Sequence, residues 1–202
     1  MTSTTGAVEW GMAACPAPGE NILGDQALVT SGDQHALAAA VDGIGHGAEA
    51  AAAARDASRV IERSAEQDVA SAARECHRAL QHTRGAAVSL ASIDCRQSAL
   101  TWVGIGNVEG RLLRGAQPMP LVESLLLHSG IVGHDLPQLR PQTMALARGD
   151  VLIFATDGIR RDFADILAPS GSCRQIAHRI LQQYATGSDD ALVLVVRYLG
   201  SR

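Results

Sequence analysis

Two apolar segments of the sequence each end in the same tripeptide, Asp-Gly-Ile, and this repetition constrains the fold more than any other feature. The first segment reads AAAVDGIGHG and contains Asp42, and the second reads LIFATDGI and contains Asp157. A short apolar run is typical of a buried strand, and the glycine that follows indicates a turn. We therefore expect both aspartates at the ends of strands, on a rigid support.

Three more carboxylates stand at predicted strand ends. Asp189 and Asp190 open the last apolar run, ALVLVV, and Asp25 follows Gly24 at the start of another strand. Oxygen ligands held rigidly suit Mg²⁺ or Mn²⁺. Two such ions about 3.5–4 Å apart can activate water for the hydrolysis of a phosphate ester. The aspartates thus indicate a site for hard divalent cations.

Each aspartate also has a simpler interpretation. Asp-Gly is a common turn dipeptide, so a single copy does not define a site. Asp25 could be only a turn residue, and Asp189–Asp190 could be only a solvated strand start. The Asp-Gly-Ile motif occurs at two strand ends, and the pair Asp189–Asp190 precedes another strand. This repetition favours the metal site.

Two glycine-bearing turns follow predicted strands. The first contains His46, which is either a turn residue or a general acid, since imidazole titrates near neutral pH. The second is Gly104-Ile105-Gly106-Asn107, which is either a tight turn or part of the rim of the site. Neither turn has the full dinucleotide fingerprint GxGxxG. A nucleotide-binding regulator therefore remains only a competing hypothesis.

Composition narrows the class of protein. The 202 residues are enough for one domain, residues 1–202, and 47% of them are hydrophobic while only 3% are aromatic, which predicts an aliphatic core. All 17 basic residues are arginine, which excludes a Walker P-loop and a kinase-type lysine. The net charge is −4 and no basic stripe is visible, so we expect no nucleic-acid partner.

The sequence also predicts the compartment. The four cysteines form no CxxC pair, which favours reduced structural thiols. The N-terminal residues lack the basic and apolar regions of a signal peptide, and no apolar run approaches the roughly 20 residues that span a bilayer. We expect a cytoplasmic protein with no membrane partner.

Hydrophobic periodicity predicts strands before and after a pair of helices. Helices are expected at residues 48–66 and 68–84, with Asp68 as the N-cap of the second, and later at 162–167 and 172–184. Strands are expected at residues 7–15, 26–30, 35–41, 86–93, 99–105, 110–114, 121–127, 143–146, 151–156 and 191–196, with a hairpin turn at 31–34. Strands that cluster in this way favour an α+β sandwich of mostly antiparallel sheets over a doubly wound parallel sheet.

The ordered motifs VDGIGHG, ATDGI and SDDALVLVV resemble those of the metal-dependent protein phosphatases of the 2C type. The match is nearest to the small bacterial branch that includes SpoIIE and RsbX, and GIGNVEG also resembles the RsbX side. The resemblance covers about residues 9–197. It implies an α-β-β-α sandwich, Mn²⁺ or Mg²⁺ as two ions, and hydrolysis of phosphoserine or phosphothreonine.

The resemblance also implies roles for individual residues. Asp42 would bridge the two metals, and the carbonyl of Gly43 would bind one of them. Asp157 and Asp189 would complete the shell of the other metal, with Asp190 as the second member of the closing pair. Asp25 would help to orient water near the metals, and His46 is the candidate for the general acid.

The sequence departs from the eukaryotic enzymes at three places. Gly24 replaces the glutamate before the early aspartate, no arginine precedes Arg55, and Ile44 stands where a histidine directly follows their Asp-Gly. The branch implies a phosphorylated STAS-domain protein as substrate, either an anti-sigma antagonist or a stressosome component, and we expect a monomer. The alternative is a catalytically weak binding module that regulates such a partner by sequestration.

Overall fold

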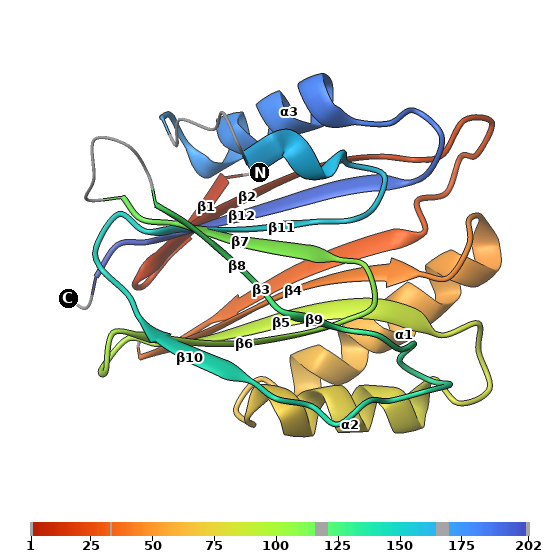
Figure 1. The fold of residues 1–202 in the computed structure, drawn as a ribbon, viewed down its shortest axis with the longest axis horizontal. Coiled ribbons are helices and arrows are strands. Elements are labelled where there is room, and N and C mark those ends of the chain that lie inside the picture. Colours follow the sequence, from red (N-terminus) through yellow and green to blue (C-terminus); the bar gives the residue numbers. More distant parts are fainter. Residues whose placement is uncertain (1, 33, 116–120, 165–169, 201–202) are drawn as a thin grey trace.

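The computed structural model describes residues 2–32, 34–115, 121–164 and 170–200 (Figure 1). Two six-stranded layers form its centre. The first sheet is antiparallel throughout and has the order β1 (Thr2–Thr5), β2 (Val8–Cys15), β12 (Ala191–Tyr198), β11 (Val151–Ala155), β7 (Glu109–Leu113), β8 (Val122–Ser124).

The second sheet lies face to face with the first. Its order is β10 (Gln142–Ala145), β6 (Ala99–Ile105), β5 (Ala86–Asp94), β4 (His35–Gly43), β3 (Asp25–Ser31), and β9 (Leu127–His128) pairs with β6 in parallel. The other neighbours in this sheet are antiparallel. The predicted preference for antiparallel sheets is confirmed.

Helices cover the outer face of each sheet (Figure 1). The helices α1 (Ala48–Arg63) and α2 (Val69–Ala79) pack on the second sheet, and α3 (Cys173–Tyr184) packs on the first. A short 3₁₀ helix, η1 (Arg161–Ala164), follows β11. The layers are thus helix, sheet, sheet, helix, which confirms the predicted α-β-β-α sandwich.

The core between the sheets is mostly aliphatic, with Trp102 and Phe154 fully buried among the smaller side chains. Strand β4 is buried at eight of its nine positions. It lies between β3 and β5 and is covered by the other sheet on one face and by α1 on the other. A strand covered on both faces reads as a continuous apolar run, and this explains the segment that leads to Asp42.

Local signals set the starts of the helices. Asp68 accepts a hydrogen bond from the backbone N–H of Ser71 at 2.9 Å and caps α2, as the sequence predicted. Ser172 and Gln175 form a capping box at the start of α3. Helix α1 has no side-chain cap, since its N-cap is Gly47.

One predicted element is wrong. Residues 121–127 do not form a single strand, because the chain passes there from one sheet to the other. Leu125 is buried and donates its N–H to the carbonyl of Gly110, whereas Leu126 is exposed. The result is two short strands, β8 in the first sheet and β9 in the second.

Smaller differences concern the ends of elements. The two predicted helices at 48–66 and 68–84 end earlier, at Arg63 and Ala79. The strand β1 was not predicted, and the described part of the helix expected at 162–167 belongs to the 3₁₀ helix η1, up to Ala164. Residues 165–167 of that prediction, and Asp33 of the predicted hairpin turn, lie outside the described residues.

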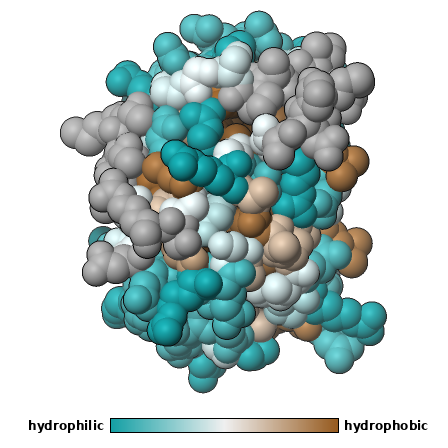
Figure 2. Space-filling model, turned by 90° about the vertical axis from the view of Figure 1, so that its left-hand side faces the viewer, coloured by the Kyte–Doolittle hydropathy of each residue, from teal (hydrophilic) through white to brown (hydrophobic). Residues whose placement is uncertain are grey.

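Figure 2 shows the end of the sandwich that lies at the left in Figure 1. Hydrophilic side chains cover much of this face, with small apolar areas between them. Within the described ranges, no helix combines the length and the apolar character required to cross a bilayer.

Gly11 allows β2 to approach the first turn of α3. A Cβ atom at this position would lie 2.4 Å from the backbone nitrogen of Arg174, so Gly11→Ala must push the helix away from the strand. We expect it to lower the free energy of unfolding by about 1–3 kcal/mol, measured by urea denaturation. The control is Gly32→Ala, where the nearest atom is 3.9 Å away. Equal stability of the two variants would contradict this account of the packing.

Candidate active site

The predicted aspartates meet at one edge of the sandwich. Strand β3 begins with Asp25, and its backbone partner across the ladder is Asp42, near the end of β4. In the other sheet, Asp157 follows the end of β11, while Asp189 and Asp190 precede β12. All of these strand ends lie at the right-hand side of Figure 1. Antiparallel order in each sheet therefore brings together residues that are far apart in the sequence.

Burial and mutual repulsion perturb these carboxyl groups. Asp25 is 1% exposed and Asp42 is 9% exposed. Burial, together with the neighbouring Asp190, Asp157 and Asp189, raises the pKa of Asp25 to about 7. Burial and the neighbouring carboxylates raise the pKa of Asp42 to about 8. Partial desolvation and the charge of Asp189 also raise the pKa of the more exposed Asp157. These groups are thus close enough to oppose one another's ionisation.

No arginine balances this charge. Among the described residues, none of the ion pairs involves any of the five aspartates. The carboxylates must therefore stay protonated, repel one another or bind a cation. Among the same described residues, no group of three or more His, Cys, Asp or Glu side chains is arranged to hold one metal ion. Mg²⁺ and Mn²⁺ fit this arrangement, because they retain several waters and need only one or two carboxylates.

Asp190 has a structural role at this edge of the sandwich. Its Oδ1 accepts a hydrogen bond from the N–H of Ala17 at 2.9 Å, and its Oδ2 accepts one from Gly24 at 3.1 Å. The carboxylate thereby ties the loop before β3 to the start of β12. Its neighbour Asp189 accepts a bond from the backbone N–H of Asp190. The predicted metal ligation by Asp190 stays a prediction, and the structure adds this second role.

Thr156 connects the two sheets behind the site. It is fully buried, and its hydroxyl donates to Oδ2 of Asp25 at 2.8 Å and accepts from the N–H of Leu192 at 2.9 Å. Thr156 directly precedes Asp157 in the chain. Its side chain therefore positions Asp25 from the segment that also contains Asp157. Sequence reasoning missed this role, because a threonine at a strand end has no distinctive pattern.

Gly43 is required for the close approach of α1. A Cβ atom on it would lie 2.2 Å from the carbonyl oxygen of Ala50, so no other residue fits without moving the helix. Its N–H points toward the carbonyl of Gly24, at 3.4 Å. The glycine thus fixes the turn that follows Asp42, and metal binding by its own carbonyl stays a prediction.

His46 lies in the turn before α1 and is largely exposed. Its Nδ1 is 2.8 Å from Oε1 of Glu20, which belongs to the loop before β3. This contact joins the glycine turn to that loop, and it orients the imidazole ring. Glu20 could not be identified from the sequence, since the pairing depends on two loops that meet only in the fold.

Asn107 brings the second glycine turn into the site. Its Nδ2 donates to Oδ2 of Asp157 at 2.6 Å. It also lies close enough to Asp42 to lower the pKa of that carboxyl, against the larger raising effect of burial. Of the two interpretations of this turn, the structure favours a place on the rim of the site.

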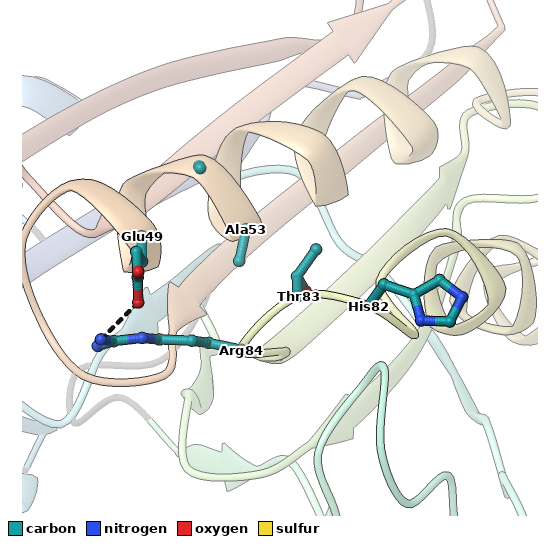
Figure 3. Close-up of a pocket in the computed structure, with 6 residues that line it drawn as sticks. Glu49, Ala53, His82, Thr83 and Arg84 are labelled. Carbon is teal, nitrogen blue, oxygen red and sulfur yellow. Dashed lines mark ion pairs between the residues drawn. The ribbon is translucent and has the colours of Figure 1, made fainter.

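A pocket of about 380 Å³ lies beside the first turn of α1 (Figure 3). It is lined by Glu49, Ala52, Ala53, His82, Thr83 and Arg84. Arg84 forms an ion pair with Glu49, and its guanidinium also lies against Gly45 in the glycine turn. The pocket is thus adjacent to the turn that carries His46, and none of the five aspartates lines it.

The comparison with protein families identifies the chain. The model of the family described as Stage II sporulation protein E (SpoIIE) matches residues 32–199. The chain belongs to the SpoIIE family. The motifs predicted this branch of the 2C-type phosphatases, and membership confirms the predicted enzyme class, a metal-dependent protein serine/threonine phosphatase. No curated protein matches the chain in sequence.

Solved structures agree with membership of the SpoIIE family. One, described as "The bacterial stressosome: a modular system that has been adapted to control secondary messenger signaling", is 28% identical, with a TM-score of 0.86 and coverage of 94% of this chain and 99% of that one. RsbX in complex with magnesium is 23% identical, with a TM-score of 0.87 and 98% coverage of both chains. The catalytic domain of PstP with two manganese ions is 15% identical, with a TM-score of 0.71 and coverage of 96% and 99%. The last two show a shared fold.

The raised pKa values predict how stability depends on pH in the metal-free protein. The folded state holds protons on Asp25 and Asp42 up to about pH 7 and 8, whereas an unfolded chain releases them near 3.8. The folded state therefore binds more protons across this window, and the free energy of unfolding falls as the pH rises. We expect a loss of at least about 2 kcal/mol between about pH 5 and pH 8, measured by urea denaturation.

The control for this measurement is Asp25→Asn, which removes one of the two titrating groups at nearly constant size. Histidines titrate in the same range, so the informative quantity is the difference between the variant and the parent protein. A smaller pH dependence in the variant is expected. Identical curves for the two proteins would show that Asp25 is ionised in the folded state at all these pH values.

Proposed function

We propose that this chain hydrolyses phosphoserine or phosphothreonine on a protein, with two Mn²⁺ or Mg²⁺ ions held at the edge where the five aspartates meet. The observation that carries the proposal is the group of buried, mutually repelling carboxylates with no ion pair to an arginine among the described residues. The resident ions supply charge neutralisation and activate water for attack on phosphorus.

The protein's own residues have distinct tasks in this proposal. Asp42, Asp157, Asp189 and the carbonyl of Gly43 hold the ions. Asp25, fixed by Thr156, lies across the strand pair from Asp42 and helps to orient water. Asp190 belongs to the same acidic group, and its bonds to Ala17 and Gly24 hold the adjoining loop.

His46 is the proposed proton donor to the leaving alkoxide. A serine or threonine alkoxide is a poor leaving group, and protonation in the transition state lowers its barrier. The bond between Nδ1 and Glu20 fixes the ring, as a carboxylate does for many catalytic histidines. The imidazole lies in an exposed turn four residues after Asp42, where a protein substrate has access to it.

The substrate proposed for this site is a phosphorylated STAS-domain protein of the cytoplasm, acted on by a monomeric phosphatase. Similarity to RsbX and to a structure from work on the bacterial stressosome supports a signalling role of this kind. The competing function is a binding module that sequesters such a partner without turnover. The binding module would be favoured if the chain bound the phosphorylated and unphosphorylated partner equally well and released no phosphate.

The direct test uses Asp42→Asn and Asp157→Asn. Each change removes a negative charge from the site at nearly constant volume. We expect the Mn²⁺-dependent release of phosphate from a phosphorylated STAS-domain protein, and from p-nitrophenyl phosphate, to fall at least about 100-fold.

The control is Asp56→Asn, which removes an exposed carboxylate on α1 that pairs only locally with Arg59. It is expected to keep full activity. Activity of the Asp42 and Asp157 variants at the level of this control would contradict the site.

A further inference from the structure

Asn107 lies in a turn whose backbone is held on both sides by hydrogen bonds. It lies in the short connection between β6 and β7, and both of its neighbours are fixed. The N–H of Gly106 donates to the carbonyl of His128 at 2.9 Å, and the buried hydroxyl of Ser89 donates to the carbonyl of Val108 at 2.7 Å.

The turn also has no room to shift. Gly106 has φ +92°, and a Cβ atom on it would lie 2.5 Å from the Cβ of Ala87. The side chain of Val108, the residue after Asn107, is fully buried. The side chain of Asn107 is therefore presented from a fixed backbone, directly beside the carboxylates.

The chemistry of the amide fixes its orientation. An ionised carboxylate only accepts hydrogen bonds, so the amide presents its NH₂ end, with two hydrogens, to aspartates that are ionised for cation binding. One bond runs from Nδ2 to Oδ2 of Asp157 at 2.6 Å, and the same side chain lies close enough to Asp42 to lower the pKa of that carboxyl. The Oδ1 of the same amide is buried and has no partner among the described residues.

We propose that Asn107 is a positioning residue, whose amide spans Asp42 and Asp157 and sets the spacing of these two carboxylates for cation binding. This inference rests on the proposed function, because it assumes that both aspartates hold a cation. Without the amide, no neutral donor or arginine would hold Oδ2 of Asp157 in place beside Asp42.

The test replaces Asn107 with leucine, which has nearly the same size and cannot donate. Residues that orient metal ligands typically change metal affinity by about 10–100-fold when they are mutated. We expect Asn107→Leu to weaken Mn²⁺ binding at least about tenfold in calorimetry. The Mn²⁺ concentration for half-maximal hydrolysis of p-nitrophenyl phosphate should rise by the same factor, while kcat at saturating Mn²⁺ recovers most of the parent value.

The matched control is Gln67→Leu. It removes another amide-to-carboxylate bond, from Nε2 of Gln67 to Glu75 at 3.1 Å, in the connection between α1 and α2 and away from the aspartates. We expect unchanged Mn²⁺ affinity. Should the Asn107→Leu protein not fold, Asn107→Ala removes the same donor without branched bulk and undergoes the same measurements.

The possible outcomes separate the inference from the function on which it rests. Equal Mn²⁺ affinity of the parent and the folded Asn107 variant would overturn the inference and leave the function intact. A kcat that stays low at every Mn²⁺ concentration, with unchanged affinity, would also overturn it. A parent protein that binds no Mn²⁺ would overturn both the inference and the proposed function.

Discussion

Electrostatic repulsion between carboxylates at the ends of four strands is the constraint on which the site depends. Asp25 and Asp42 are almost fully buried, and Asp157 and Asp189 lie near enough to raise their pKa values. A buried charge without a partner is unfavourable, so such a group persists only on a framework that cannot relax. The two hydrogen-bonded sheets supply that framework, because each strand end is fixed by its neighbours on the ladder.

Neutral hydrogen-bond donors reinforce the framework where arginines are absent. Thr156 connects Asp25 to both β11 and β12, and backbone N–H groups of the loop before β3 hold Asp190. Asn107 donates to Asp157 from the turn between β6 and β7. These groups restrict the geometry of the carboxylates and add no positive charge to the site. An arginine in any of these places would compete with a divalent cation for the same oxygens.

The layered fold and the position of the aspartates could be predicted from the sequence, since both depend on local patterns. The apolar run before Asp42 and the run before Asp157 each identify a buried strand, and the glycines mark where each strand ends. The path of residues 121–127 could not be predicted, because the alternation of apolar residues does not show that Leu125 packs beside Gly110 while the chain changes sheets. Long-range contacts such as His46 with Glu20 likewise appear only once two loops are folded against each other.

Proton release on Mn²⁺ binding tests the central claim most directly. If the buried carboxylates hold the cation, ions must displace the protons that Asp25 and Asp42 retain up to about pH 7 and 8. Calorimetry of the metal-free protein at about pH 6.5, in buffers of different ionisation enthalpy, should show release of at least about one proton, which declines above about pH 8. Mn²⁺ binding without proton release, or no binding, would contradict the account.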